Sequence, residues 1–205
     1  MLRTLLVGNG EVAPALVKKL VKCHSFIVAA DGGADALLDA GIVPDAVVGD
    51  LDSVSENARQ KIPSEHFFFV PNQNTNDLEK ALSFLSARGC TACTLAGFTG
   101  GREDFSAGNL LALFAFADNM QLCLAGSGWK IFPLMRTRSF VCEKGKRVSL
   151  IVLQTCQKVS LKGLKFPLKN TRLPFGTTRT LSNETTGKRF TVSLKSGKML
   201  VYVED

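Results

Sequence analysis

Two aspartates stand two residues apart at the end of a short β-branched run. Asp50 and Asp52 follow Gly49, and an extended backbone would point both side chains to one face. Two carboxylates that close repel each other, and one pKa rises unless a cation neutralises the pair. A cluster of oxygen ligands is typical of Mg²⁺, which proteins commonly share with phosphate oxygens. For this pair alone, a solvated acidic loop is an equally good interpretation.

Similar polar groups follow three other predicted strands. The four clusters are Asp31-Gly32-Gly33, Gly49-Asp50-Leu51-Asp52, the segment 71–77 and the segment 97–104. Ligands of an open parallel sheet bind outside the carboxyl ends of its strands. The glycine pairs 32–33 and 100–101 would let backbone amides approach phosphate oxygens, and Arg102 adds a planar guanidinium fork. Together the clusters predict a site for a metal ion and a polyphosphate.

Several of these residues have structural interpretations. Asn76 and Glu79 form the pattern of a capping box, and Asp104 is placed to cap a helix that begins at Ser106. The segment Gly8-Asn9-Gly10 is more typical of a tight turn than of a phosphate loop. The chain has no Walker sequence, which argues against an ordinary P-loop kinase.

The alternation of strand and helix patterns predicts an α/β domain at residues 1–130, with a mostly parallel sheet and flanking helices. Predicted strands are 2–7, 26–30, 46–48, 66–70, 91–96 and 121–125, and predicted helices are 12–21, 34–40, 77–87 and 106–117. Residues 131–205 show short strand patterns alone, which predicts a second, all-β sandwich or barrel domain. Its predicted strands are 138–142, 147–153, 158–161, 178–182, 189–194 and 199–203.

The composition of the chain argues against several classes of function. Residues 1–130 carry 10 Lys and Arg against 14 Asp and Glu, whereas residues 131–205 carry 15 against 4. The basic part lacks a pattern of stacking aromatics, so we expect no nucleic-acid partner. No apolar stretch is long enough for a membrane span, and no secretory signal is evident, which predicts a cytoplasmic protein without a membrane partner. The six cysteines are expected to be free thiols in the core. Because the chain has only two histidines, any metal is expected to be bound by oxygen ligands.

The quoted segments, in this order, resemble the thiamine pyrophosphokinase family. The resemblance rests on Ala30 to Ala34, Gly49 to Ser53, Thr75 to Leu82, Gly100 to Asp104 with Asn109, Val148 to Leu150, Gly163 to Leu168 and Leu181 to Glu184. It implies transfer of the diphosphoryl group of ATP to thiamine, giving thiamine diphosphate and AMP. It also implies that the α/β domain binds ATP and Mg²⁺, that the sandwich helps to bind thiamine, and that the enzyme is a homodimer.

Site roles follow from the resemblance. Expected metal ligands are Asp31, Asp50, Asp52 and Asp77, and expected catalytic residues are Asp50, Asp52, Asp77, Arg102 and Asp104. Expected nucleotide contacts are Asp31, Gly32, Gly33, Gln73, Thr75, Gly100, Gly101 and Asn109, and expected thiamine contacts are Ser182 and Asn183. Within this scheme Arg102 stabilises the transferred group, and Asp104 orients the thiamine hydroxyl or acts as general base.

Four positions depart from the family pattern. Asn72, Asn74 and Asn76 stand where Asp, Asp and Thr are common, and Phe105 replaces a His or Gln. Two alternatives stay open, and only the second is motivated by these four positions. One is a diphosphokinase with another acceptor, such as a pterin alcohol, and the other is a catalytically silent protein that binds thiamine or a nucleotide.

Overall fold

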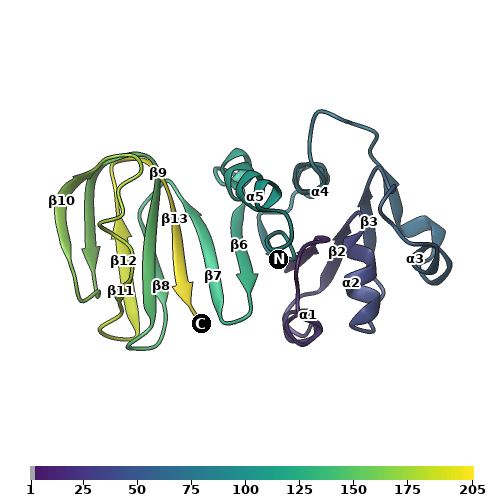
Figure 1. The fold of residues 1–205 in the computed structure, drawn as a ribbon, viewed down its shortest axis with the longest axis horizontal. Coiled ribbons are helices and arrows are strands. Elements are labelled where there is room, and N and C mark those ends of the chain that lie inside the picture. The colour runs from purple at the N-terminus through teal and green to yellow at the C-terminus, as the bar shows by residue number, and fades with distance from the viewer. Residues whose placement is uncertain (1–2) are drawn as a thin grey trace. The chain divides into compact units, whose positions relative to one another are not determined.

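The computed structural model describes residues 3–205, and the chain divides into two units, Met1–Ser127 and Gly128–Asp205 (Figure 1). The predicted boundary followed residue 130, and the predicted first strand began at Leu2, which lies outside the described residues. Which substrate each unit binds stays a prediction at this point.

The first unit contains a parallel sheet. Its strands are β1 (Thr4–Val7), β2 (Phe26–Ala30), β3 (Ala46–Gly49), β4 (Phe67–Phe69), β5 (Ala92–Ala96) and β6 (Gln121–Gly126). They lie in the order β4-β3-β2-β1-β5-β6, and every neighbouring pair is parallel. The predicted α/β fold is therefore confirmed. All carboxyl ends of the strands meet at one edge, and the order reverses between β1 and β5, where such sheets bind ligands.

Helices cover both faces of this sheet (Figure 1). They are α1 (Pro14–Val21), α2 (Gly33–Asp39), α3 (Glu56–Lys61), α4 (Asp77–Ala87) and α5 (Glu103–Phe116). Side chains of α1, α2 and α3 share one core with alternate residues of β1 to β3, whereas α4 packs against β2, β3 and α5. The sequence did not predict α3, although Ser55 caps it by accepting a hydrogen bond from Ala58 N at 3.1 Å. Helix α5 begins at Glu103, before the predicted start at Ser106.

The second unit is an antiparallel β-sandwich. Its strands are β7 (Trp129–Leu134), β8 (Arg138–Val141), β9 (Arg147–Lys162), β10 (Leu168–Leu173), β11 (Asn183–Glu184), β12 (Arg189–Ser193) and β13 (Ser196–Glu204). The first part of β9 pairs with β11 and β13, and its last part pairs with β10 and β12. Lys158 has φ 51 where this change of partners occurs, so β9 bends and contributes to both layers. The buried core includes stacked Phe140 and Phe190 rings, whose centroids are 4.8 Å apart.

Several predicted strands of this unit need correction. Segments 147–153 and 158–161 are one strand, because β9 continues through the polar stretch between them. The predicted strand 178–182 is a loop, in which Ser182 has φ 57. Strands β7, β10 and β11 were not predicted.

The cysteines are free thiols, as expected, but only Cys93 and Cys156 are buried, and Cys23 is exposed. Within residues 3–205, no helix has both the length and the apolar character needed to cross a membrane.

Candidate functional site

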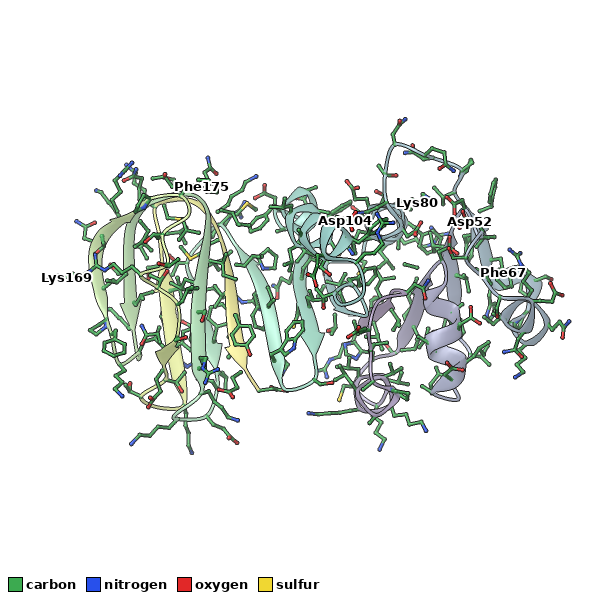
Figure 2. The ribbon with its side chains drawn as sticks, in the orientation of Figure 1. Asp52, Phe67, Lys80, Asp104, Lys169 and Phe175 are labelled. Carbon is green, nitrogen blue, oxygen red and sulfur yellow. The ribbon has the colours of Figure 1, made fainter. Side chains whose placement is uncertain are left out.

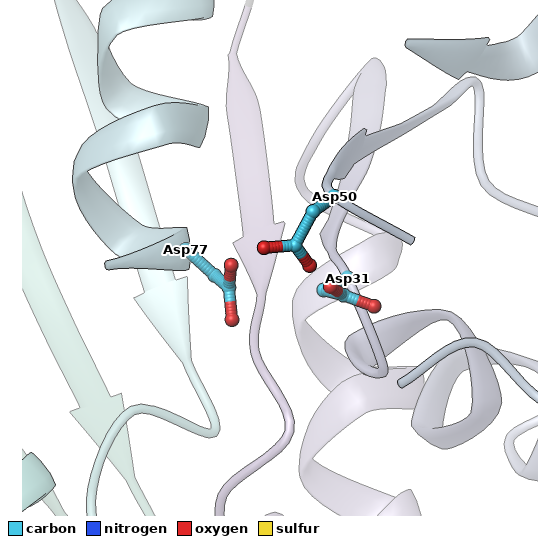
Figure 3. Close-up of side chains that lie close together, drawn as sticks. All are labelled: Asp31, Asp50 and Asp77. Carbon is cyan, nitrogen blue, oxygen red and sulfur yellow. The ribbon is translucent and has the colours of Figure 1, made fainter. Parts of the chain in front are cut away.

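Three aspartates from separate segments meet at the carboxyl edge of the parallel sheet (Figure 3). Asp31 follows β2, Asp50 follows β3, and Asp77 is the first residue of α4. One carboxylate oxygen from each lies within 4.8 Å of the others. We call these three residues the acidic cluster. The predicted convergence of strand ends is what brings them together.

Asp31 is the buried member of the acidic cluster, with 1% of its surface exposed. Its Oδ1 accepts a hydrogen bond from Ser53 N at 3.2 Å, while within the described chain its buried Oδ2 has no hydrogen-bond partner. Burial, followed by the nearby carboxylates of Asp50 and Asp77, raises the pKa of Asp31 to about 7. An unpaired buried carboxylate oxygen is costly, and a cation would satisfy it. The all-oxygen set of ligands therefore fits a hard divalent ion such as Mg²⁺.

Asp52 is not a member of this cluster, contrary to the expectation that it faces the same way as Asp50. Leu51 has φ 64, so the backbone turns directly after β3 and the alternation of an extended strand is lost. Asp52 is exposed and accepts a hydrogen bond from Ser53 Oγ at 3.0 Å. Its charge still lies near enough to contribute to the raised pKa of Asp31.

Lys80 is a site residue that sequence reasoning missed. It is 5% exposed, and its Nζ lies 2.6 Å from Asp50 Oδ2 and 3.1 Å from Asp77 Oδ1. The hydrogen bond from Lys80 is the main cause that lowers the pKa of Asp50 to about 2. A lysine one helical turn after Asp77, among the buried apolar residues of α4, is the signal that could have identified it.

The loop before α4 contributes further contacts. Gln73 Nε2 donates to Asp50 Oδ2 at 3.3 Å, which places this predicted nucleotide contact beside the acidic cluster. The capping box is confirmed, because Asn76 Oδ1 accepts from Glu79 N and Glu79 Oε2 accepts from Asn76 N. Asn76 Nδ2 also donates to Asn109 Oδ1 at 3.1 Å. Thr75 stands directly before the N-cap.

A pocket of about 500 Å³ opens between the ends of β1 and β5, and we call it the strand-edge pocket. Its lining includes Gly8, Asn9, Gly10, Glu11, Asn76, Asp77, Gly100, Gly101, Arg102, Phe105, Ser106 and Asn109. The segment 8–10 was expected to be a tight turn. Instead it runs beside the residues after β5, since Gly10 N donates to Gly97 O at 2.7 Å. Asn109 is 9% exposed and also donates to Phe98 O at 3.0 Å, so its amide holds the pocket wall together.

The two predicted glycine pairs have different surroundings. Gly100 and Gly101 have φ values of 83 and 73 and line the strand-edge pocket. Gly32 and Gly33 are absent from its lining among the described residues, and they stand where α2 begins against β1. A Cβ on Gly33 would lie 2.1 Å from Val7 O, so close packing alone requires glycine there.

Arg102 and Asp104 form an exposed ion pair at the start of α5. Arg102 Nη2 and Nε donate to the two carboxylate oxygens of Asp104 at 2.6 and 3.1 Å. This pairing lowers the pKa of Asp104, which makes it a weaker base. Asp104 lies inside the first turn and does not serve as the N-cap, which is Arg102. The Arg102 guanidinium also lies 4.3 Å from the centre of the Phe105 ring.

The second unit contains its own pocket of about 420 Å³, which we call the sandwich pocket. It is lined by Leu161, Lys165, Phe166, Pro167, Leu168, Arg179, Thr180, Leu181 and Asn183. Asn183 is 7% exposed. Its Oδ1 accepts a hydrogen bond from Phe166 N at 3.0 Å, and its Nδ2 donates to Phe166 O at 2.8 Å. It thereby fixes the backbone of Phe166, a residue that is 62% exposed. Ser182 is exposed beside the pocket lining.

Comparisons with known proteins agree with this architecture. A family model described as "Thiamin pyrophosphokinase, catalytic domain" matches residues 17–124, and one described as "Thiamin pyrophosphokinase, vitamin B1 binding domain" matches residues 137–199. This chain belongs to the thiamin pyrophosphokinase family. The predicted family and enzyme class are thus confirmed.

The matches to individual relatives cover nearly the whole chain. Thiamine pyrophosphokinase of Bacillus subtilis is 30% identical over 186 residues, covering 87% of this chain and 86% of the relative. A crystal structure of thiamine pyrophosphokinase from that organism superposes with a TM-score of 0.87 at 26% identity, covering 98% of this chain and 99% of the other. One from Geobacillus thermodenitrificans gives a TM-score of 0.84 at 25% identity, covering 98% and 97%. These relatives give no support to a different acceptor or to a silent binding protein.

Proposed function

We propose that this chain catalyses transfer of the diphosphoryl group of ATP to the hydroxyl of thiamine, releasing AMP. The observation that carries the proposal is the acidic cluster, with its unpaired buried Asp31 Oδ2, at the ligand-binding edge of the sheet in a member of this family. The thiamine oxygen attacks the β-phosphorus, the bond from that phosphorus to the oxygen of AMP breaks, and the hydroxyl proton passes to the solvent.

Asp31, Asp50 and Asp77 would hold Mg²⁺, with Asp52 outside this set. When bound, Mg²⁺ neutralises charge on the phosphate oxygens. Gln73 restrains Asp50, and the capping box restrains the start of α4 and hence Asp77. These fixed positions matter because phosphoryl transfer depends mainly on positioning and electrostatics.

ATP would occupy the strand-edge pocket, where the Gly101 backbone amide and the Arg102 guanidinium would contact its phosphates. Gly100 also lines this pocket, but its N donates a hydrogen bond to Ser106 Oγ at 3.1 Å and so shapes the loop. Arg102 stabilises charge on the transferred group, and Asp104 orients Arg102 through their bidentate ion pair. Since this pairing weakens Asp104 as a base, we favour an orienting role for it over proton abstraction. Thr75, Gly32 and Gly33 remain proposed nucleotide contacts, although the close packing of Gly33 against Val7 is by itself sufficient to require glycine there.

Thiamine would bind at the sandwich pocket, with the exposed Phe166 ring as an aromatic surface for its heterocycles. Asn183 positions Phe166, and Ser182 remains a candidate for a hydrogen bond to the aminopyrimidine. From the family resemblance we also propose a homodimer located in the cytoplasm.

The test is identification of the products. Purified protein with ATP, Mg²⁺ and thiamine should release AMP and thiamine diphosphate, and Asp50→Asn should lose most of that rate. Asp45→Asn is the matched control, since Asp45 accepts a hydrogen bond from Ile27 N at 2.7 Å at the opposite end of β3. Release of ADP would contradict diphosphoryl transfer, and AMP release with a pterin alcohol but not with thiamine would change the acceptor.

A further inference from the structure

Lys80 places a buried positive charge against two of the three proposed metal ligands. Its side chain is 4% exposed, and it contacts Asp50 at 2.6 Å and Asp77 at 3.1 Å. Figure 2 shows Lys80 on α4, in the first unit. Burial of a lysine ammonium costs free energy unless carboxylates surround it, so these two contacts are what holds Lys80 in place.

The same carboxylates are the ones that a divalent cation would need. Asp31, Asp50 and Asp77 carry three formal negative charges when ionised, and Lys80 offsets one of them. An ammonium bound to the same carboxylates lies only a few ångströms from a metal ion that they ligate. Like charges at that separation repel strongly in a partly buried site.

We propose that Lys80 is a fixed counter-ion of the acidic cluster, which keeps Asp50 and Asp77 in place and weakens the affinity of the cluster for a free divalent cation. This inference rests on the proposed function, because it assumes that the cluster binds the cation. Its consequence is that the cation binds tightly only together with the nucleotide, whose phosphates supply the negative charge that Lys80 has offset. Lys80 is therefore a positioning residue that couples metal binding to nucleotide binding.

The test measures binding of Mn²⁺ by the full-length protein, using the electron paramagnetic resonance signal of the free ion. Without nucleotide, Lys80→Met should bind Mn²⁺ on the order of tenfold or more tightly than the unaltered chain, because a nearby unit charge has been removed. With a non-hydrolysable ATP analogue, the unaltered chain should gain more Mn²⁺ affinity than Lys80→Met does. Lys80→Arg, which keeps the charge, should behave like the unaltered chain.

Lys130→Met is the matched control, since Lys130 forms an ion pair with Asp205 in the second unit. Its Mn²⁺ affinity should not change. Thermal unfolding gives a second readout, in which EDTA-treated Lys80→Met should melt at a lower temperature than the unaltered chain and Mn²⁺ should restore its stability.

The possible outcomes separate the two hypotheses. Equal or weaker Mn²⁺ binding by Lys80→Met overturns the role of Lys80, even if the unaltered chain releases AMP normally. If Lys80→Met fails to fold without metal, folding in the presence of Mn²⁺ supports the proposal, and failure with Mn²⁺ as well overturns it. If the unaltered chain binds no Mn²⁺ even with the ATP analogue and releases no AMP, the proposed function itself fails, and the role of Lys80 falls with it.

Discussion

The strand-edge pocket and the sandwich pocket are built in different ways. The first lies where parallel strands end, so residues far apart in the sequence meet there because the sheet places all its carboxyl ends together. The second is lined mainly by two segments, 165–168 and 179–183, which are held against each other by the Asn183 amide. One pocket depends on the fold of a whole sheet, and the other depends on one hydrogen-bonded pair of loops.

Their chemistry differs in the same way. The strand-edge pocket has Asp77 of the acidic cluster on its wall, together with the Arg102 guanidinium and backbone amides. The sandwich pocket has no acidic residue in its described lining, and it presents Phe166, Leu181 and two basic side chains. This contrast fits the proposal that the first unit binds the phosphates of ATP and the second unit binds the aromatic acceptor. Substitutions at the acidic cluster and the strand-edge pocket should therefore lower the rate of AMP release, whereas substitutions in the sandwich pocket should raise the KM for thiamine.

The largest effect is expected at Asp31. Asp31→Asn keeps an acceptor for Ser53 N but removes the buried charge that we propose as a metal ligand. We expect AMP release to fall at least about 100-fold, since loss of a charged group that positions a transferred phosphoryl group has effects of this size. The thiamine concentration that gives half-maximal rate should change little. Steady-state kinetics with varied Mg²⁺ and thiamine will measure both.

The metal-free Asp31→Asn protein should be at least as stable as the unaltered chain, because an unpaired buried carboxylate has been removed. Thermal unfolding in EDTA is the control for folding. Full activity of Asp31→Asn would show that the acidic cluster is not the metal site.

A large loss of stability is expected where α2 meets β1. In Gly33→Ala the new methyl group would lie 2.1 Å from Val7 O, and a backbone atom cannot move aside easily. The free energy of unfolding should fall by about 2 kcal/mol or more. Gly108→Ala is the matched control in α5, where nothing outside the local helix backbone lies within 4 Å of the added Cβ. That variant should gain about 0.5 to 1 kcal/mol, because alanine favours a helix over glycine. Urea denaturation compares the two.

A smaller and more selective effect is expected in the sandwich pocket. Phe166→Ala removes an exposed aromatic ring from the pocket and should raise the KM for thiamine about tenfold, since loss of one stacking surface costs roughly 1 kcal/mol or more. The KM for ATP should stay the same. Phe175→Ala is the control, because Phe175 is 70% exposed and lies outside the pocket lining. Equal KM changes for thiamine and ATP in Phe166→Ala would remove the distinction between the two pockets.

The sequence predicted the acidic cluster because the physical rule behind it is simple. Parallel strands with polar residues after their last position bring those residues to one edge, so Asp31, Asp50 and Asp77 could be grouped without coordinates. The same reasoning failed for Asp52, because nothing in the local sequence indicates that Leu51 adopts φ 64. Leucine rarely adopts a positive φ, and where it does, contacts from the surrounding fold hold the backbone in that conformation.

Lys80 escaped prediction for a different reason. A lysine on an amphipathic helix is usually a solvated residue, and only the packed position of α4 shows that its ammonium is buried between two carboxylates. In the second unit the strands are antiparallel, so the carboxyl ends of neighbouring strands lie at opposite edges, and no simple rule predicts which residues meet. The bend in β9 was therefore interpreted as a gap between two strands, and the sandwich pocket depends on pairings such as Asn183 with Phe166 that no periodicity indicates.

The smallest effect is expected where the strand-edge pocket is tied together by two amides. Asn76 caps α4, and its Nδ2 also donates to Asn109 Oδ1 at 3.1 Å, a bond that the shorter threonine side chain would lose. Asn76→Thr keeps an N-cap hydroxyl but leaves the buried Asn109 oxygen without this donor. We expect a loss of about 1 kcal/mol in the free energy of unfolding. Asn74→Thr, exposed in the same loop, should change it by less than about 0.5 kcal/mol. A double-mutant cycle with Asn109→Ala isolates the bond. Additive losses in that cycle would mean that the two amides act independently, so that the hydrogen bond from Asn109 to Phe98 O is the one through which Asn109 holds the pocket wall.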